Sequence, residues 1–220
     1  MIIDIKQLKE IKNPKFFVVE GVNGAGKGTI IEKLKLYFAD KNIDTLFTRE
    51  PGAGDFGTAI RDLVLNPKEK LAEVTELFLF SADRSNHVAK IIKPVIDKKT
   101  TVISDRYYYS TISFQGYGRG INLDQIHSIC NIAIQGLRPD LVLLLDVDAE
   151  IGLARTKKIR EQGRDAFEEE KINFHKKIRK GYLELAKNLP EKFIIIDTNK
   201  NPDEVWEEVK SIFDILFKNE

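Results

Sequence analysis

Three residues between positions 21 and 27 have the types and the spacing of a phosphate-binding loop. Gly21, Gly26 and Lys27 match the first seven positions of the pattern G-x-x-x-x-G-K-[ST]. Glycines let successive backbone N–H groups curl around phosphate oxygens, and the lysine ammonium reaches the terminal phosphates of a nucleotide. The eighth position is Gly28 instead of Ser or Thr, so the hydroxyl that usually binds Mg²⁺ is missing. The pattern predicts a nucleotide site with an altered metal shell.

The residues on either side of this loop support the prediction. Residues 16–19 are apolar without alternation, as in a strand that is buried on both faces. Apolar residues between Ile30 and Phe38 then recur at helical spacing. A tight turn that only needs small residues is the alternative interpretation. Lys27 at the start of the helix argues against that alternative, because a turn alone needs no lysine there.

Charged residues occur just after other predicted strands. Arg49 and Glu50 follow one strand, Asp105 and Arg106 follow another, and a basic segment, 155–164, lies beyond a third. Ligands of parallel sheets bind beyond the carboxyl ends of the strands, so these residues are expected to lie near the loop. Guanidinium groups bind phosphate oxygens in pairs, and a carboxylate can hold Mg²⁺ or its waters. The pattern accommodates two phosphorylated substrates.

The apolar runs predict an α/β protein. Strands are expected at residues 16–19, 45–48, 101–104, 141–146 and 192–197. Helical patterns separate them, which favours a three-layer α/β/α sandwich around a five-stranded parallel sheet. Asn201 and Pro202 are expected to begin a closing helix. We divide the chain into an N-terminal extension, residues 1–15, which is expected to pack as a short helix, and a single domain, residues 16–220.

The composition excludes several other classes of protein. The 35 basic and 34 acidic residues nearly cancel, so no global field attracts nucleic acid or an anionic membrane. One cysteine excludes an internal disulfide, and three scattered histidines do not indicate a zinc site. No apolar run is long enough to span a membrane, and no signal peptide is evident. We therefore expect a cytoplasmic protein with small-molecule substrates, without nucleic acid or membrane partners.

From about Lys15 onward, the chain resembles the thymidylate kinases, which have the P-loop kinase fold. Six stretches occur in the order and approximate spacing of that family: FFVVEGVNGAGKGT, FTREPG, FLFSADR, SDRYYYSTISFQG, RPDLVLLLDVDAEIGLAR and FHKKIRKGYLELA. Members of the family transfer the γ-phosphoryl group of ATP to dTMP, with Mg²⁺, and form homodimers. The resemblance, and not the periodicity, implies the identity of the nucleobase. The expected ATP-binding residues of the loop are Gly21, Asn23, Gly24, Ala25, Gly26, Lys27, Gly28 and Thr29.

The resemblance also implies roles at the acceptor site. Arg49 and Arg106, with Glu50 beside them, would bind the dTMP phosphate, and Asp105 would organise Mg²⁺ through water. Phe80 would stack on thymine. The residues expected around the base edge and the sugar are Arg84, Thr111, Gln115 and Phe114, and Pro51 resembles a cis-proline of the family.

The basic segment corresponds to the lid of the family, at about residues 156–167. A solvated surface is the usual role of such a run, and its expected position above ATP argues for function. Gly24 and Ala25 leave the phosphate loop without an arginine, so the lid must supply the catalytic one. Arg160 and Arg164 are the candidates, and Arg155 is expected to lie along the adenine or ribose.

Three residues depart from the family pattern. Ala166 stands where the lid usually has arginine, and Arg164 is the possible substitute. Asn23 replaces an acidic residue near the acceptor sugar, and an amide carries no charge and can also donate a hydrogen bond. Gly28 removes a metal ligand, so we expect Mg²⁺ to be held by ATP oxygens and waters, while Thr29 binds a phosphate.

Two other functions stay open at this point. One is a nucleoside monophosphate kinase with another acceptor, such as dUMP or a purine nucleotide, and the other is a non-catalytic ATP-sensing switch. The several arginines at strand ends favour an enzyme with two phosphorylated substrates. Packing alone is the alternative role for Phe80, and a weak surface ion pair is the alternative for Arg84 and Arg106. His87 is interpreted as an ordinary helix residue without an acid–base partner.

Overall fold

The sheet is five-stranded and entirely parallel, as predicted. The computed structural model describes residues 1–159 and 166–218. The strands are β1 (Phe16–Glu20), β2 (Thr45–Arg49), β3 (Thr101–Asp105), β4 (Leu141–Asp146) and β5 (Phe193–Asp197). Their order across the sheet is β2-β3-β1-β4-β5. The central strands read as uninterrupted apolar runs because helices cover both of their faces.

The register brings the charged strand ends to one edge of the sheet. Arg49 pairs with Asp105 across β2 and β3, and Val19 pairs with Asp105 across β1 and β3. The observed strands extend one residue further than predicted here, so that Arg49 and Asp105 belong to strand ends and do not follow them. Glu20 is the last residue of β1 and is fully buried. Three strands therefore deliver ionisable side chains to the same edge.

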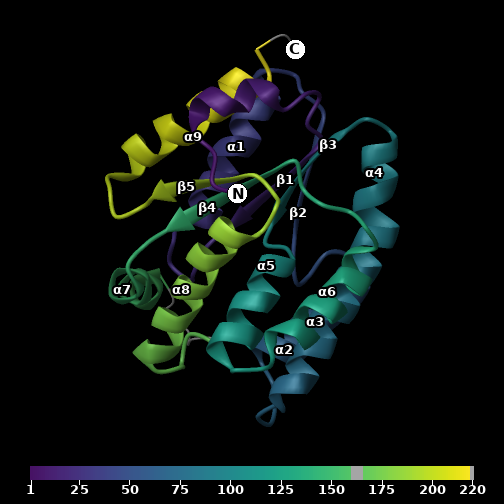
Figure 1. Ribbon diagram of the computed structural model, residues 1–220, viewed down its shortest axis with the longest axis vertical. Coiled ribbons are helices and arrows are strands. Elements are labelled where there is room, and N and C mark those ends of the chain that lie inside the picture. Colours follow the sequence, from purple (N-terminus) through teal and green to yellow (C-terminus); the bar gives the residue numbers. More distant parts are fainter. Residues whose placement is uncertain (160–165, 219–220) are drawn as a thin grey trace.

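Helices cover the two faces of the sheet. In Figure 1, α1 and α9 lie on one side of the sheet, and α5, α6 and α8 lie on the other. The α-helices are α1 (Lys27–Asp40), α2 (Gly54–Leu65), α3 (Glu73–His87), α4 (Lys93–Asp97), α5 (Tyr108–Thr111), α6 (Leu123–Ile134), α7 (Ala149–Ile159), α8 (Ile172–Asn188) and α9 (Pro202–Leu216). One 3₁₀-helix, η1 (Ile5–Glu10), and two π-helices, η2 (Val88–Ile92) and η3 (Ile112–Gly118), complete the described elements.

The closing helix begins as the sequence predicts. The Asn201 side chain accepts a hydrogen bond from the Asp203 amide, and Pro202 is the first helical residue. The apolar stripe of α9 packs on α1 and β1, where Phe213 contacts Phe17 and Phe38 with ring centroids 5.2 and 5.4 Å apart. This contact fixes the helix that follows the phosphate loop against the sheet.

The first residues of the chain pack on the edge of the sheet. Ile2 pairs in parallel with Phe193 of β5, and the amide of Ile3 donates to the Phe193 carbonyl. The short helix expected in this region is η1, which Asp4 caps and which buries Leu8 completely. In the described parts of the chain, no helix is both long and apolar enough to cross a membrane.

The phosphate loop and α7 approach each other without space for a side chain between them. A Cβ atom on Gly24 would lie 2.0 Å from the carbonyl oxygen of Gly152, and Gly24 also has a φ of +77°. A Cβ atom on Gly152 would lie 2.6 Å from the carbonyl oxygen of Asn23. The helix that leads into the lid region therefore supports the loop through backbone contact.

We predict that Gly152→Ala lowers the free energy of unfolding by about 1–3 kcal/mol, because the new methyl group overlaps the loop backbone. Helix propensity alone predicts the opposite, a gain of up to about 1 kcal/mol. Gly28→Ala in α1 is the matched control, since its added Cβ has no neighbour within 4 Å. Urea unfolding measures both variants. An equal stabilisation of the two would contradict the close contact between the loop and α7.

Candidate active site

One cavity of about 540 Å³ lies at the carboxyl edge of the sheet and gathers the predicted residues. Except for Gly21, every predicted site residue that the structure describes lines this cavity. The Gly21 carbonyl accepts hydrogen bonds from two side chains of the site, Lys27 and Arg106. The predicted residues that line the cavity are Asn23, Gly24, Ala25, Gly26, Lys27, Gly28, Thr29, Arg49, Glu50, Phe80, Arg84, Asp105, Arg106, Thr111, Phe114, Gln115 and Arg155. The predicted lid arginines, Arg160 and Arg164, lie outside the described residues.

The phosphate loop holds its lysine against loop carbonyls. Gly26 precedes α1 in a left-handed conformation, which lets the loop turn into the helix. The Lys27 ammonium donates to the carbonyl oxygens of Gly21 and Val22 at 3.0 and 3.1 Å. Burial lowers the pKa of Lys27 to about 7, and the neighbouring Arg106 guanidinium adds to this effect. The loop therefore holds a cation whose charged form an anionic ligand would stabilise.

Packing does not explain Gly28, the departure next to this lysine. A Cβ atom on Gly28 would meet no atom within 4 Å outside the backbone of its own helix, and Gly28 does not have a positive φ. Gly28 and Thr29 are both exposed at the first turn of α1 and line the cavity. The protein's own contacts thus leave room for a larger residue here.

Arg106 connects the phosphate loop to Tyr182 of α8 and to Phe114 of η3. Its backbone is left-handed, with φ of +73°, directly after β3. One guanidinium nitrogen donates to the Gly21 carbonyl and the Tyr182 hydroxyl, each at 3.0 Å, and the other donates to Asn23 Oδ1 at 2.8 Å. The guanidinium also lies 5.3 Å from the ring centre of Phe114. A surface ion pair with Asp105, the alternative considered from sequence, is not what the structure shows.

The Glu20 carboxylate balances the positive charge of Arg106. Glu20 was not among the site residues predicted from the sequence. Its carboxylate accepts from the Tyr107 amide at 2.8 Å, from the Ser110 hydroxyl at 2.8 Å and from the Tyr182 hydroxyl at 2.9 Å. Burial raises the pKa of Glu20, while Arg106, 3.8 Å away, lowers it. The position of Glu20, a charged residue at the end of a buried strand, is the signal in the sequence that could have identified it.

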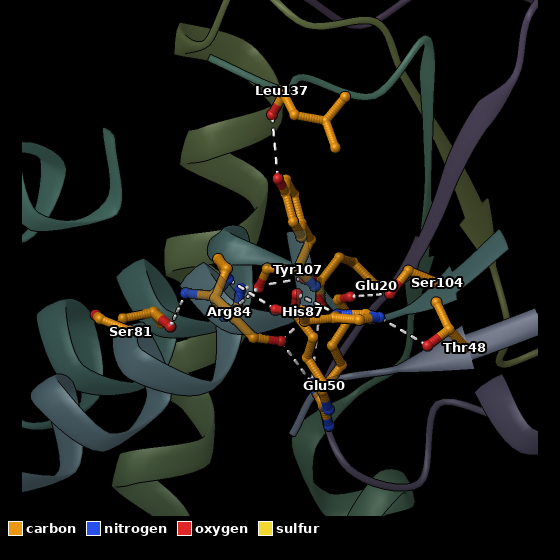
Figure 2. A network of polar contacts seen from close by, with 12 residues as sticks. Glu20, Thr48, Glu50, Ser81, Arg84, His87, Ser104, Tyr107 and Leu137 are labelled. Carbon is orange, nitrogen blue, oxygen red and sulfur yellow. Dashed lines mark hydrogen bonds and ion pairs between the residues drawn. The ribbon is translucent and has the colours of Figure 1, made fainter. Parts of the chain in front are cut away.

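A buried network orients the residues expected beside the base (Figure 2). Arg84 is 2% exposed and donates to Glu50 at 2.7 Å and to the Thr111 hydroxyl at 2.8 Å. His87 links the other oxygen of Glu50, at 2.9 Å, to the Thr48 hydroxyl, at 2.7 Å. His87 is a residue of α3, as expected, but the expectation that it has no acid–base partner was wrong. Arg84 is not a surface residue.

Three aromatic rings form a wall of the same cavity. Phe80 and Phe114 each contact Phe167, with ring centroids 5.9 and 5.6 Å apart. Phe78, only two residues from Phe80 in α3, is instead 57% exposed. The structure thus distinguishes Phe80, which lines the cavity, from Phe78, which is exposed, although sequence spacing alone could not. The cavity is also lined by three residues that were not predicted from the sequence, Phe167, Glu168 and Arg61.

The remaining predicted residues of the cavity are Asp105, Arg49 and Arg155. Asp105 has a buried carboxylate oxygen, Oδ1, with no hydrogen-bond partner in the described protein. Arg49 is exposed beside it. Arg155 donates to the Thr198 carbonyl at 3.0 Å and reaches toward the Gly24 carbonyl at 3.5 Å. The peptide bond between Glu50 and Pro51 is cis, as the resemblance implied.

Known proteins resemble the chain over most of its length. Residues 19–209 match the family model described as thymidylate kinase. The thymidylate kinase of Carboxydothermus hydrogenoformans is 42% identical over 202 residues, covering 92% of this chain and 98% of that protein. The thymidylate kinase of Oleidesulfovibrio alaskensis is 43% identical over 204 residues, covering 89% of this chain and 95% of its own.

A solved structure agrees with these sequence matches. The crystal structure of thymidylate kinase from Ehrlichia chaffeensis has a TM-score of 0.74 and 29% identity, and covers 90% of this chain and 98% of its own. The five-stranded parallel sheet with its covering helices is the fold that this match supports. The chain belongs to the thymidylate kinase family.

Proposed function

We propose that the protein transfers the γ-phosphoryl group of ATP to the phosphate of dTMP and so forms dTDP. One observation supports this reaction more than any other. The Lys27 ammonium and the Arg106 guanidinium both donate to the carbonyl oxygen of Gly21, each at 3.0 Å. Lys27 belongs to the nucleotide loop, and Arg106 faces the acceptor side. Two phosphates bound to these neighbouring cations would meet end to end.

On the donor side, the loop amides around residues 21–26 and Lys27 bind the phosphates of ATP. The Thr29 hydroxyl is exposed at the first turn of α1, where it can bind a phosphate oxygen. Arg155 is proposed to contact the adenosine, and its hydrogen bonds to the carbonyls of Gly24 and Thr198 support this role. The family match supports ATP as the donor.

On the acceptor side, Arg49 and Arg106 bind the phosphate of dTMP. Phe80 and Phe114 bound the space for the base and the sugar, and Gln115 faces the same cavity. Thr111 accepts from Arg84, so its own hydroxyl proton stays available to a base carbonyl. The buried bonds of Glu50 to Arg84 and His87 hold this side of the site in one arrangement.

The residues present fit a Mg²⁺ ion that is held mainly by substrate. Among the described residues, no group of three or more His, Cys, Asp or Glu side chains could bind a metal on its own. Asp105, with its unpartnered buried oxygen, is the residue that would hold Mg²⁺ through water. When bound, the ion would neutralise charge on the phosphate oxygens of ATP.

The reaction needs no covalent enzyme intermediate, because the phosphate of dTMP already carries a nucleophilic oxygen. Lys27 and Arg106 orient the donor and acceptor and neutralise the charge on the migrating group. Arg160 and Arg164 are proposed to contribute from the lid. Ala166 replaces the usual lid arginine, and its amide donates to the Leu65 carbonyl at 3.3 Å.

We also propose that the protein forms a homodimer. Apolar side chains stay exposed on neighbouring helices, where a second copy would cover them. They are Phe56 and Leu63 of α2, Val74 and Phe78 of α3, and Ile132 of α6. The proposed partners are thus ATP, dTMP and a second copy of the chain.

A panel of acceptors tests the proposed reaction. With ATP and Mg²⁺, we expect phosphorylation of dTMP to exceed that of dUMP and of purine deoxynucleoside monophosphates. Lys27→Ala is expected to lower kcat about a thousandfold without unfolding the protein, because it removes charge that acts on the migrating phosphoryl group. A coupled assay for ADP and circular dichroism measure the two quantities. Binding of ATP without transfer to any monophosphate would instead favour the ATP-sensing switch.

The pKa of Lys27 predicts a proton uptake when ATP binds. The free protein has a pKa of about 7 at this lysine, and bound phosphates raise it. At pH 8 the complex therefore holds more protons than the free protein, and ATP affinity falls as the pH rises above 7. Calorimetry in buffers of different ionisation enthalpy should show uptake of about one proton per site at pH 8. Equal uptake by Lys27→Met would contradict the assignment to this residue.

Arg106→Lys is predicted to raise the KM for dTMP about ten- to a hundredfold, because lysine keeps the charge but loses the paired donors. The KM for ATP should change by less than about threefold, since the donor phosphates contact Lys27 and the loop amides. Steady-state kinetics with each substrate varied separately gives both values. An unchanged KM for dTMP would remove Arg106 from the acceptor site.

A further inference from the structure

Arg119 connects three segments around the acceptor side of the cavity. Its guanidinium donates to both carboxylate oxygens of Glu76 in α3, at 3.0 and 3.1 Å. It also forms an ion pair with Glu170, which follows the lid segment. The Arg119 side chain is only 8% exposed, although it does not itself line the cavity. We call this set of contacts the Arg119 bridge.

The Arg119 bridge also contacts the aromatic wall. The guanidinium lies 5.4 Å from the ring centre of Phe167 and 4.8 Å from that of Phe174. Phe167 is 4% exposed and contacts Phe80 and Phe114, which are both proposed substrate residues. The ring of Phe167 is therefore held between a buried cation on one side and the acceptor cavity on another.

Gln115 belongs to the same network. Its amide nitrogen donates to Glu76 Oε2 at 3.3 Å, and the same oxygen accepts from Arg119. Glu76 thereby orients the Gln115 amide, while Arg119 fixes Glu76. The orientation of the Gln115 amide and the position of the Phe167 ring thus both depend on Arg119.

We propose that Phe167 sets the width of the space for the acceptor base, and that Arg119 is the residue that positions it. This inference rests on the proposed function, because it assigns Phe167 to the acceptor and not to ATP. The ring of Phe167, with those of Phe80 and Phe114, limits the cavity to a base of pyrimidine size. Because Phe167 lies three residues after Arg164, the Arg119 bridge also anchors the end of the lid segment that carries the proposed catalytic arginines.

The first test removes the ring and measures acceptor choice. Phe167→Ala is expected to raise the KM for dTMP about tenfold, because one apolar wall of the base site is lost. The same variant should raise the rate with dGMP relative to dTMP by about tenfold or more. The KM for ATP is expected to stay within about twofold, since the Phe167 ring contacts Phe80 and Phe114, which are assigned to the acceptor. Equal increases in the KM for dTMP and for ATP would overturn the proposal.

The second test asks whether Arg119 acts through Phe167. Arg119→Met keeps an unbranched side chain of similar length but removes the charge and its hydrogen bonds. We expect about a three- to tenfold rise in the KM for dTMP, with the same shift toward dGMP. In the Phe167→Ala/Arg119→Met double variant, the effect should stay within about twofold of Phe167→Ala alone, because the two residues act as one unit. Multiplicative effects would show that Arg119 acts independently of Phe167, through Glu76 and Gln115 or through the fold, and would overturn its assignment as the residue that positions Phe167.

Arg138→Met is the matched control. Arg138 also pairs with a buried carboxylate, Glu191, but lies away from the cavity. Arg138→Met should leave the KM for dTMP, the KM for ATP and the rate with dGMP relative to dTMP unchanged. A shift toward dGMP in Arg138→Met would overturn the proposal. If Phe167→Ala is insoluble, Phe167→Leu replaces it. We then expect the KM for dTMP and the rate with dGMP relative to dTMP each to rise about threefold. Wild-type protein that phosphorylates no dTMP would refute the proposed function itself, while active wild type with unaltered variants would refute this inference alone.

Discussion

Two cations share one backbone oxygen at the centre of this protein, and much of the surrounding structure supports that arrangement. Lys27 and Arg106 both donate to the carbonyl of Gly21, so two positive charges lie side by side in a largely buried place. Such a pair is costly without counter-charges. Glu20 and Asp105 supply negative charge nearby, and burial together with Arg106 lowers the pKa of Lys27 to about 7. The site is thereby prepared for polyanions before any substrate arrives.

The fold supplies this arrangement through strand register and close backbone contact. β1 ends in Glu20 and β3 ends in Asp105, one residue before Arg106. Gly24 and Gly152 let the loop rest on α7 with no side chain between them. The same contact explains why an arginine cannot occupy position 24, since even a Cβ atom has no room there. We propose the lid as the source of a catalytic arginine instead.

The sequence predicted features whose cause is local or periodic. The phosphate loop, the five strands and the cap of α9 at Asn201 follow from residues close together in the chain. Glu20 could not be assigned a role in the same way, because its partners Ser110 and Tyr182 are 90 and 162 residues away. Phe78 and Phe80 have the same type and lie on one helix, and only tertiary packing decides that Phe80 enters the cavity. Phe167 looks like any apolar residue until Arg119 is seen beside it.

The departures from the family pattern have different physical contexts. The Asn23 side-chain oxygen accepts a hydrogen bond from Arg106, which leaves its amide nitrogen to donate to other groups. An aspartate there would form an ion pair with the Arg106 guanidinium, the group that we propose binds the acceptor phosphate. Gly28 stands in open space, so packing offers no reason for the lost hydroxyl.

A crystal structure with dTMP and a non-hydrolysable ATP analogue bound together would show which phosphates Lys27 and Arg106 contact. We expect Lys27 to contact the terminal phosphates of the ATP analogue and Arg106 to contact the phosphate of dTMP, with the two reacting phosphates adjacent. A complex in which Arg106 faces away from dTMP, or in which both cations bind the same nucleotide, would contradict this expectation.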